Sequence, residues 1–265
     1  MKPRVTRNAS QIRIGVDVMI CNNLVSMYYD RAKERNIADI RIGLGYTAVL
    51  LDDGRCGLAW TGTGVEKTCC SLMEDAGFFI GKSAAELINF YPSHTPIKAS
   101  VGLATINSLA NYEKTGKKEG DILGCLNLKP DDRVGIIGDF KPLVKEMEKI
   151  TENIFIFEKN FSDSKYFTSE TEMAEILPSC SVVLITATSL VNKTFESLIE
   201  LTKNVPSCAM LGPSTPLVPA FFSDKNIRIL SGVQVIDTDK VLQVVSQAGG
   251  MKSFKNYVKK VNVFI

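Results

Sequence analysis

The second half of the chain repeats one pattern of apolar and polar positions. A short apolar run at 133–138 ends in Gly138 and Asp139, and an amphipathic segment at 141–150 follows it. Four more apolar runs come later, at 153–157, 181–189, 207–211 and 227–232. Runs that are apolar throughout are typical of parallel strands buried on both faces, and the helical segments between them supply the crossovers. The pattern predicts a doubly wound α/β domain over residues 129–265.

The first half has a different pattern and predicts a smaller α+β module over residues 1–128. Apolar residues spaced by three and four predict a helix at 16–35, and alternating positions around a turn at Asp52 to Gly54 predict a hairpin spanning 39–60. Two further helices are expected at 83–91 and 97–112. At the other end of the chain, the spacing of Tyr257, Val258, Val261 and Phe264 favours a closing helix at 252–265.

Polar or small residues follow most of the predicted strands of the second half. Because the carboxyl ends of parallel strands lie along one edge of a sheet, we expect these residues to meet in one crevice that binds a ligand. The candidates are Gly138, Asp139, Glu158, Thr186, Thr188, Gly212, Ser214 and Thr215.

Two carboxylates among these candidates suggest a cation site. Asp139 and Glu158 follow neighbouring apolar runs, and threonine or serine hydroxyls could add oxygen ligands. Such hard ligands indicate a metal ion without identifying it, and divalent or heavy metals both remain open. The alternative is structural, with a capping aspartate and an ion-paired glutamate.

A nucleotide site is the second functional hypothesis. Gly135 and Gly138 form part of a dinucleotide-binding glycine motif, and Glu158 follows Gly138 by 20 residues (158 − 138), where an acid can accept from a ribose hydroxyl. NAD or S-adenosylmethionine would suit this arrangement. The third glycine of the motif is missing, and the charge of Asp139 opposes a pyrophosphate.

Composition excludes several other classes of protein. The formal charge of +2 gives no field that would recruit nucleic acid or a membrane, no apolar run approaches the roughly 20 residues of a membrane helix, and a cytoplasmic location is expected. The seven cysteines show no metal-binding spacing, with Cys69-Cys70 as their only cluster, and His94 is the only histidine. No serine or cysteine nucleophile can therefore be assigned with its base, and whether the chain is an enzyme stays open.

Four blocks of sequence together resemble a known family. They lie at 43–61, 99–109, 185–194 and 212–219, and include the runs GLATINSLA and GPSTPLVP. They are similar to prokaryotic proteins of largely unknown activity, for which heavy-metal chelation is a proposal.

The resemblance implies an enolase N-terminal-like domain followed by a Rossmann-like domain, with a small-molecule or metal site in the cleft between them. Asn107 would face this cleft from the first domain, and Asp139, Thr188, Asn192, Ser214 and Thr215 would face it from the second. The chain departs from the family pattern at Ala187-Thr188-Ser189, where a glycine-containing turn is expected, and at Lys193, where glycine is expected. Two-domain α/β proteins often self-associate, so a homo-oligomer is a further expectation.

Overall fold

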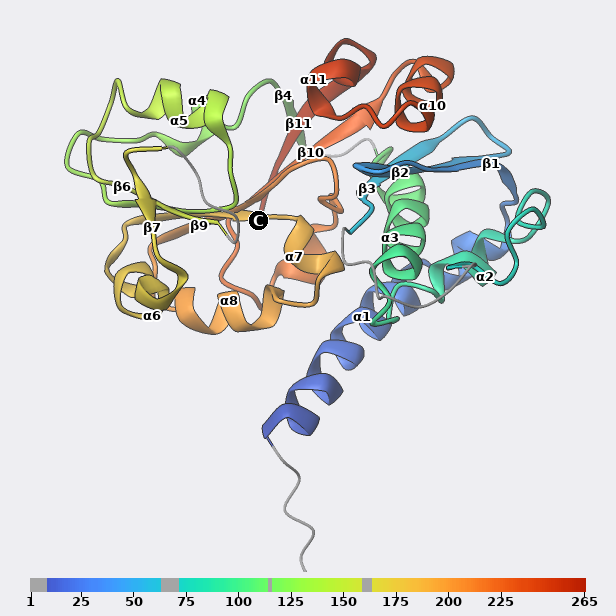
Figure 1. Ribbon diagram of the computed structural model, residues 1–265, viewed down its shortest axis with the longest axis horizontal. Helices are drawn as coiled ribbons and strands as arrows, with labels where there is room; N and C mark the ends of the chain where they lie inside the picture. The colour runs from blue at the N-terminus through green and yellow to red at the C-terminus, as the bar shows by residue number, and fades with distance from the viewer. Residues whose placement is uncertain (1–8, 63–71, 114–115, 159–163) are drawn as a thin grey trace, which may run out of the picture.

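The computed structural model describes residues 9–62, 72–113, 116–158 and 164–265, with side chains described from Met19 onward. Two parts lie side by side, a small sheet with three helices and a large sheet covered by helices on both faces (Figure 1). The predicted Cys69-Cys70 cluster lies outside the described residues. In the described part, no helix is long and apolar enough to cross a membrane.

The small part is an antiparallel meander backed by helices. Its strands β1 (Ile37–Ile42), β2 (Tyr46–Leu51) and β3 (Cys56–Trp60) pair in the order β1-β2-β3. Its helices are α1 (Ala9–Lys33), α2 (Ala84–Ile88) and α3 (Pro96–Ala110). Helix α3 packs directly on β2 and β3 because small residues let the backbones approach. A Cβ added at Gly57 would lie only 2.0 Å from the carbonyl oxygen of Ala104.

The large part has eight strands in the order β4-β11-β10-β9-β8-β5-β6-β7. They are β4 (Lys117–Glu119), β5 (Val134–Ile137), β6 (Ile154–Phe157), β7 (Phe167–Thr168), β8 (Val182–Thr186), β9 (Ser207–Leu211), β10 (Ile229–Val235) and β11 (Val258–Phe264). The strands β5 to β10 are parallel, and numbered along the chain they lie as 3-2-1-4-5-6. This is the strand order of a Rossmann-like sheet, so the predicted fold class is confirmed.

Short helices cover both faces of the large sheet (Figure 1). They are α4 (Leu123–Leu126), α5 (Lys141–Met147), α6 (Met173–Ile176), α7 (Thr188–Val191), α8 (Phe195–Thr202), α9 (Pro219–Phe222), α10 (Thr238–Ser246) and α11 (Met251–Phe254). On one face, Ile136 packs with Val144 and Met147 of α5. On the other face, Val183 packs with Phe195 of α8.

The closing helix expected at 252–265 is wrong. Only α11 and a 3-10 turn at Lys255–Tyr257 are helical, and β11 then pairs antiparallel with β10 along its whole length. The spacing of Val258 and Val261 suits a helix, but these β-branched residues pack equally well on a pleated sheet. The pairing with β10 favours a strand over a helix because it satisfies the backbone hydrogen-bonding groups of both β10 and β11.

Two smaller expectations for the first half also need correction. The stretch expected as one strand at 39–51 is divided into β1 and β2 by a turn at 43–45. Of the stripe predicted to pack inward from α1, Leu24 and Tyr28 are buried, but Met19 and Met27 are 57% and 43% exposed. The amino-terminal end of α1 projects away from the rest of the molecule (Figure 1).

The two parts share a hydrophobic core. Ala48 and Leu58 of the small sheet pack in one cluster with Val233 of β10 and Val241 of α10. Strand β4, which precedes the predicted boundary at 128/129, pairs with β11 in the large sheet. The boundary itself stays a prediction.

Candidate functional site

The ends of β5 and β8 meet where the order of the parallel strands reverses. Gly138 ends β5, and its N–H donates to the carbonyl of Phe157 at 2.9 Å. It has a φ of +108°, and a Cβ at this position would lie 3.0 Å from the Cβ of Thr186. Glycine is therefore favoured both by the backbone conformation and by the close approach of the neighbouring strand. In open α/β sheets, ligands bind at this switch point.

Two threonine hydroxyls line the β8 side of the switch point. The Oγ1 atoms of Thr186 and Thr188 are 3.1 Å apart, and the Thr188 N–H donates to Thr186 Oγ1 at 3.4 Å. Both residues are partly exposed. Asn192, which follows α7, uses its Oδ1 to accept from the N–H and hydroxyl of Thr194, at 3.3 and 2.7 Å. The hydroxyls of Thr186 and Thr188 are thus accessible polar groups on this side of the switch point.

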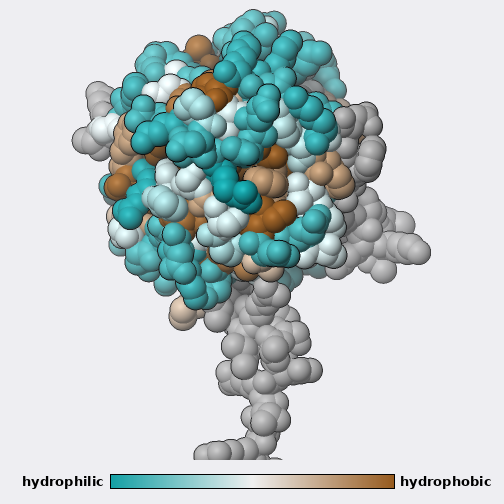
Figure 2. All heavy atoms as spheres, turned by 90° about the vertical axis from the view of Figure 1, so that its left-hand side faces the viewer, coloured by the Kyte–Doolittle hydropathy of each residue, from teal (hydrophilic) through white to brown (hydrophobic). Residues whose placement is uncertain are grey.

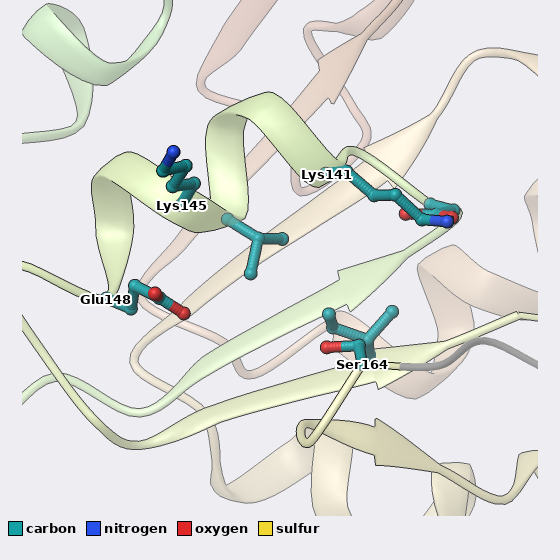
Figure 3. A pocket seen from close by; sticks show the side chains of 7 residues that line it. Lys141, Lys145, Glu148 and Ser164 are labelled. Carbon is teal, nitrogen blue, oxygen red and sulfur yellow. The ribbon is translucent and has the colours of Figure 1, made fainter.

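Asp139 lies on the β5 side of the switch point. Its carboxylate is 3.4 Å from the ammonium of Lys141, and 29% of its side chain is exposed. Asp139 is also one of the residues that line a pocket of about 270 Å³. Figure 3 shows this pocket between α5 and the sheet. The other lining residues are Lys141, Val144, Lys145, Glu148, Ile156 and Ser164. Because its charged residues are two acids and two lysines, the pocket has no net charge.

The face of the molecule that carries α5, α6 and the β6–β7 edge is mostly hydrophilic, with small separate apolar areas (Figure 2). It offers no broad apolar surface for a large hydrophobic partner. A small polar ligand suits this end of the sheet better.

The donor set at this edge is small for a bare metal ion. Glu158 directly follows β6, the neighbour of β5, and is partly exposed. Asp139 and Glu158 therefore end adjacent strands. Within the described residues, no three side chains of histidine, cysteine, aspartate or glutamate gather closely enough to hold an ion. Among the described residues, at most two side chains of these four kinds therefore come together here.

A second group of predicted site residues lies in the seam between the two parts. The side-chain amide of Asn107 donates to the carbonyls of Leu58 at 2.8 Å and Ser214 at 3.1 Å. The Trp60 N–H donates to the hydroxyl of Ser214 at 2.8 Å. Asn107 and Thr215 are fully buried, and in the described part of the chain Asn107 Oδ1 and Thr215 Oγ1 have no hydrogen-bond partner.

The sequence analysis missed Asn111, which extends this network. Its side-chain amide donates to the carbonyls of Thr215 at 3.1 Å and Val233 at 3.3 Å, and its Oδ1 accepts from Leu217 N–H at 2.8 Å. The available signal was the spacing of four residues from Asn107, which places both amides on one face of α3. These two asparagines join the small part to the loop after β9.

The structure therefore divides most of the predicted residues into two groups, and Asn192, the residue after α7, belongs to neither. The first, at the sheet edge, comprises Gly138, Asp139, Glu158, Thr186 and Thr188. The second, in the buried seam, comprises Asn107, Ser214 and Thr215. Gly212 leads into the seam with a φ of +123°. His94 is exposed and belongs to neither group. The ligand-binding role of all these residues stays a prediction.

Comparisons with known proteins cover nearly the whole chain. Two family models that share the description "Putative heavy-metal chelation" match residues 26–110 and 121–264. An uncharacterised protein of Methanocaldococcus jannaschii is 26% identical over 251 residues, which span 90% of this chain and 92% of the relative.

Two solved structures have the same fold, and both are described as proteins of unknown function. The Pyrococcus horikoshii protein has a TM-score of 0.80 and 23% identity, covering 93% of this chain and 100% of that one. The Desulfitobacterium hafniense protein has a TM-score of 0.78 and 24% identity, covering 94% and 98%. At these identities the likeness establishes the fold alone.

Proposed function

Because the chain belongs to the family described as "Putative heavy-metal chelation", we propose that it binds a small molecule carrying a metal ion at the carboxyl edge of its parallel sheet. The observation that carries this proposal is the reversal of strand order between β5 and β8. Gly138 and Asp139 lie on one side of the reversal, and Thr186 and Thr188 lie on the other. Polar groups at the ends of separate strands thus border the reversal, and such a reversal is the usual ligand site of these sheets.

The metal is the cargo in this proposal, and the small molecule supplies part of its coordination. Asp139 and Glu158 offer hard oxygen ligands, but two carboxylates leave most positions around a divalent ion open. A chelate that already holds the ion needs only one or two protein oxygens. The hydroxyls of Thr186 and Thr188 would bind polar atoms of the chelate and orient it.

The small part supports the site from one side. Helix α3 and strand β3 contact α7, which begins at Thr188. The amides of Asn107 and Asn111 hold the loop after β9 against the small part. The proposed site is accordingly interdomain, with its charged residues on the large sheet.

Titration calorimetry with Mn²⁺ alone and with Mn²⁺-citrate tests this proposal. Mn²⁺ prefers oxygen ligands, which limits binding to the cysteines, and citrate stands in for an oxygen-donor chelator. We expect the citrate complex to bind more tightly than the bare ion. Asp139→Asn should weaken it at least about tenfold, because losing even an outer-shell partner of a metal typically costs about 10–100-fold.

The matched control is Asp131→Asn, which removes an exposed carboxylate at the opposite end of β5. We expect it to bind like the wild type. Equal affinity of the two variants, or no binding of either probe by the wild type, would contradict the proposal.

A nucleotide is a second candidate ligand, favoured by the 3-2-1-4-5-6 order and by Glu158 at the end of the second parallel strand. NAD and S-adenosylmethionine at millimolar concentration should then raise the thermal midpoint, since a ligand stabilises by RT ln(1 + [L]/Kd). Glu158→Gln should reduce the shift. An unchanged midpoint with both compounds would remove this candidate.

A further inference from the structure

A lysine of the large part meets a cysteine and a tyrosine of the small part. Cys21 comes from α1, Tyr91 follows α2, and Lys193 lies between α7 and α8. The Lys193 Nζ is 3.2 Å from Cys21 Sγ and donates to the backbone carbonyl of Tyr91 at 2.6 Å. The same ammonium lies 4.1 Å from the centre of the Tyr91 ring. Cys21 and Tyr91 are 4% and 1% exposed.

Lys193 stands where the family pattern predicts glycine. Its φ of +60° is in the left-handed region, which glycine occupies far more readily than lysine. Glycine has no side chain, so a glycine at this position could not reach α1 and Tyr91 as Lys193 does. Lys193 is itself partly exposed, so the cluster has one side open to solvent.

Cys21 differs from the buried thiols of Cys56, Cys180 and Cys208 because a lysine ammonium lies at hydrogen-bond distance from its sulfur. Burial is the main cause that raises the pKa of Cys56 to about 12 and the pKa values of Cys180 and Cys208 to about 11. The sulfurs of these three contact backbone carbonyls. At Cys21 an ammonium donates to the sulfur, and such a donor stabilises the thiolate, which is the reactive form.

The phenol of Tyr91 is also hydrogen-bonded to the side chain of Cys21. Burial, with smaller contributions from Cys21 and Glu196, raises the pKa of its phenol well above the ordinary value. It therefore stays protonated at neutral pH, and its ring and carbonyl hold the Lys193 ammonium in place.

We propose that Cys21 and Lys193 form an oxidative crosslink when the protein meets a hydroperoxide such as hydrogen peroxide. The Cys21 thiolate attacks one peroxide oxygen, the O–O bond breaks, and the departing hydroxide takes a proton from the Lys193 ammonium to form water. This step leaves a sulfenic acid beside a neutral amine. The Lys193 nitrogen then attacks the sulfur, the S–O bond breaks, and the leaving hydroxide takes a proton from nitrogen. The product is a sulfenamide and a second water, and the sulfur loses two electrons to the peroxide.

This bond would join α1 to the segment after α7. The linked residues are 172 positions apart (193 − 21), and a crosslink that closes a long loop restricts the unfolded chain most. We expect the thermal midpoint of the oxidised protein to rise by on the order of 5–10 °C. A thiol reductant should reverse the rise.

Peptide mass spectrometry of the full-length protein tests the crosslink directly. The protein is treated with hydrogen peroxide, remaining thiols are blocked with N-ethylmaleimide, and the tryptic digest is examined before and after dithiothreitol. We expect a linked pair of peptides containing Cys21 and Lys193, lighter than their sum by two hydrogen atoms and released by dithiothreitol. Lys193→Arg keeps the positive charge but removes the nucleophilic amine, so it should yield sulfenic acid without the linked pair.

Lys225→Arg is the matched control. Lys225 also donates to a backbone carbonyl and lies over the ring of the same residue, Phe221, but its side-chain partner is the carboxylate of Asp224. This variant should form the crosslink as the wild type does. The proposal is overturned if Cys21 stays a free thiol, becomes a sulfinic acid without linkage to Lys193, or pairs with another cysteine.

Discussion

The seam around α3 and the edge of the parallel sheet both gather polar side chains, but they use them in opposite ways. In the seam, Asn107 and Asn111 are buried and donate to the backbone carbonyls of Ser214 and Thr215 across the interface. At the edge, Thr186 and Thr188 bond mainly to each other and remain partly exposed. A buried polar group must be satisfied by the protein, whereas an accessible one can exchange water for a ligand. Stability should therefore depend on the seam and ligand affinity on the edge.

Adding a methyl group between β3 and α3, the elements that border the seam, should have the largest effect. In Gly57→Ala the new Cβ would lie 2.0 Å from Ala104 O and 2.2 Å from Ser108 N, so β3 would have to move away from α3. We expect a loss of about 3 kcal/mol in the free energy of unfolding, measured by urea titration. Gly124→Ala, where no atom lies within 4 Å of the added Cβ, should change it by about 0.5 kcal/mol. Equal losses in both variants would show that the close packing of β3 on α3 is unimportant.

Removing an amide from the seam should have the next largest effect. Asn111→Ala loses three interdomain hydrogen bonds and leaves buried backbone groups of Thr215, Val233 and Leu217 without this partner. The expected cost is about 2–3 kcal/mol by the same titration. The control is Asn89→Ala, whose exposed amide bonds only within its own helix end, and it should cost about 0.5 kcal/mol. A loss as small as that of the control would remove the distinction between seam and edge.

Changing a hydroxyl at the edge should alter binding more than stability. Thr188→Val keeps the shape of the side chain but removes the hydroxyl that hydrogen-bonds with the hydroxyl of Thr186. Affinity for Mn²⁺-citrate should fall about 2–10-fold, the value of one hydrogen bond, with an unfolding free energy within about 1 kcal/mol of the wild type. Thr168→Val, on β7 two strands from β5, should leave affinity unchanged. A stability loss in Thr188→Val that matches Asn111→Ala would make the edge structural as well.

The smallest expected effect is on the alkaline stability of the seam. Burial raises the pKa of Tyr112 to about 12, although a hydrogen bond from the Cys56 N–H opposes the rise. A raised pKa in an acid group means that its stabilising contribution is complete below pH 10 and is lost as the pH rises toward 12. The urea midpoint of Tyr112→Phe should therefore fall less steeply than that of the wild type as the pH rises from 10 to 12. An identical slope in both proteins would mean that Tyr112 ionises as freely when folded as when unfolded.

The alternation of apolar runs with amphipathic segments was sufficient to predict the parallel sheet and that Gly138, Glu158 and Thr186 lie at the ends of its strands. Each strand is buried on both faces, so its composition records its environment directly. The tail shows where this reasoning stops. The spacing of Val258 and Val261 fits helix and strand alike, and only the free edge of β10 selects the strand.

The fold class and the approximate position of a polar edge can be predicted from residue patterns alone, because both follow from patterns that are local in the chain. Which polar residues are accessible at that edge depends on tertiary packing. Asn107 and Ser214 are 107 positions apart and nothing local marks them as hydrogen-bonded to each other, while Lys193 meets Cys21 across 172 positions. Contacts of this kind depend on how the two parts pack, and packing is a property of the whole chain.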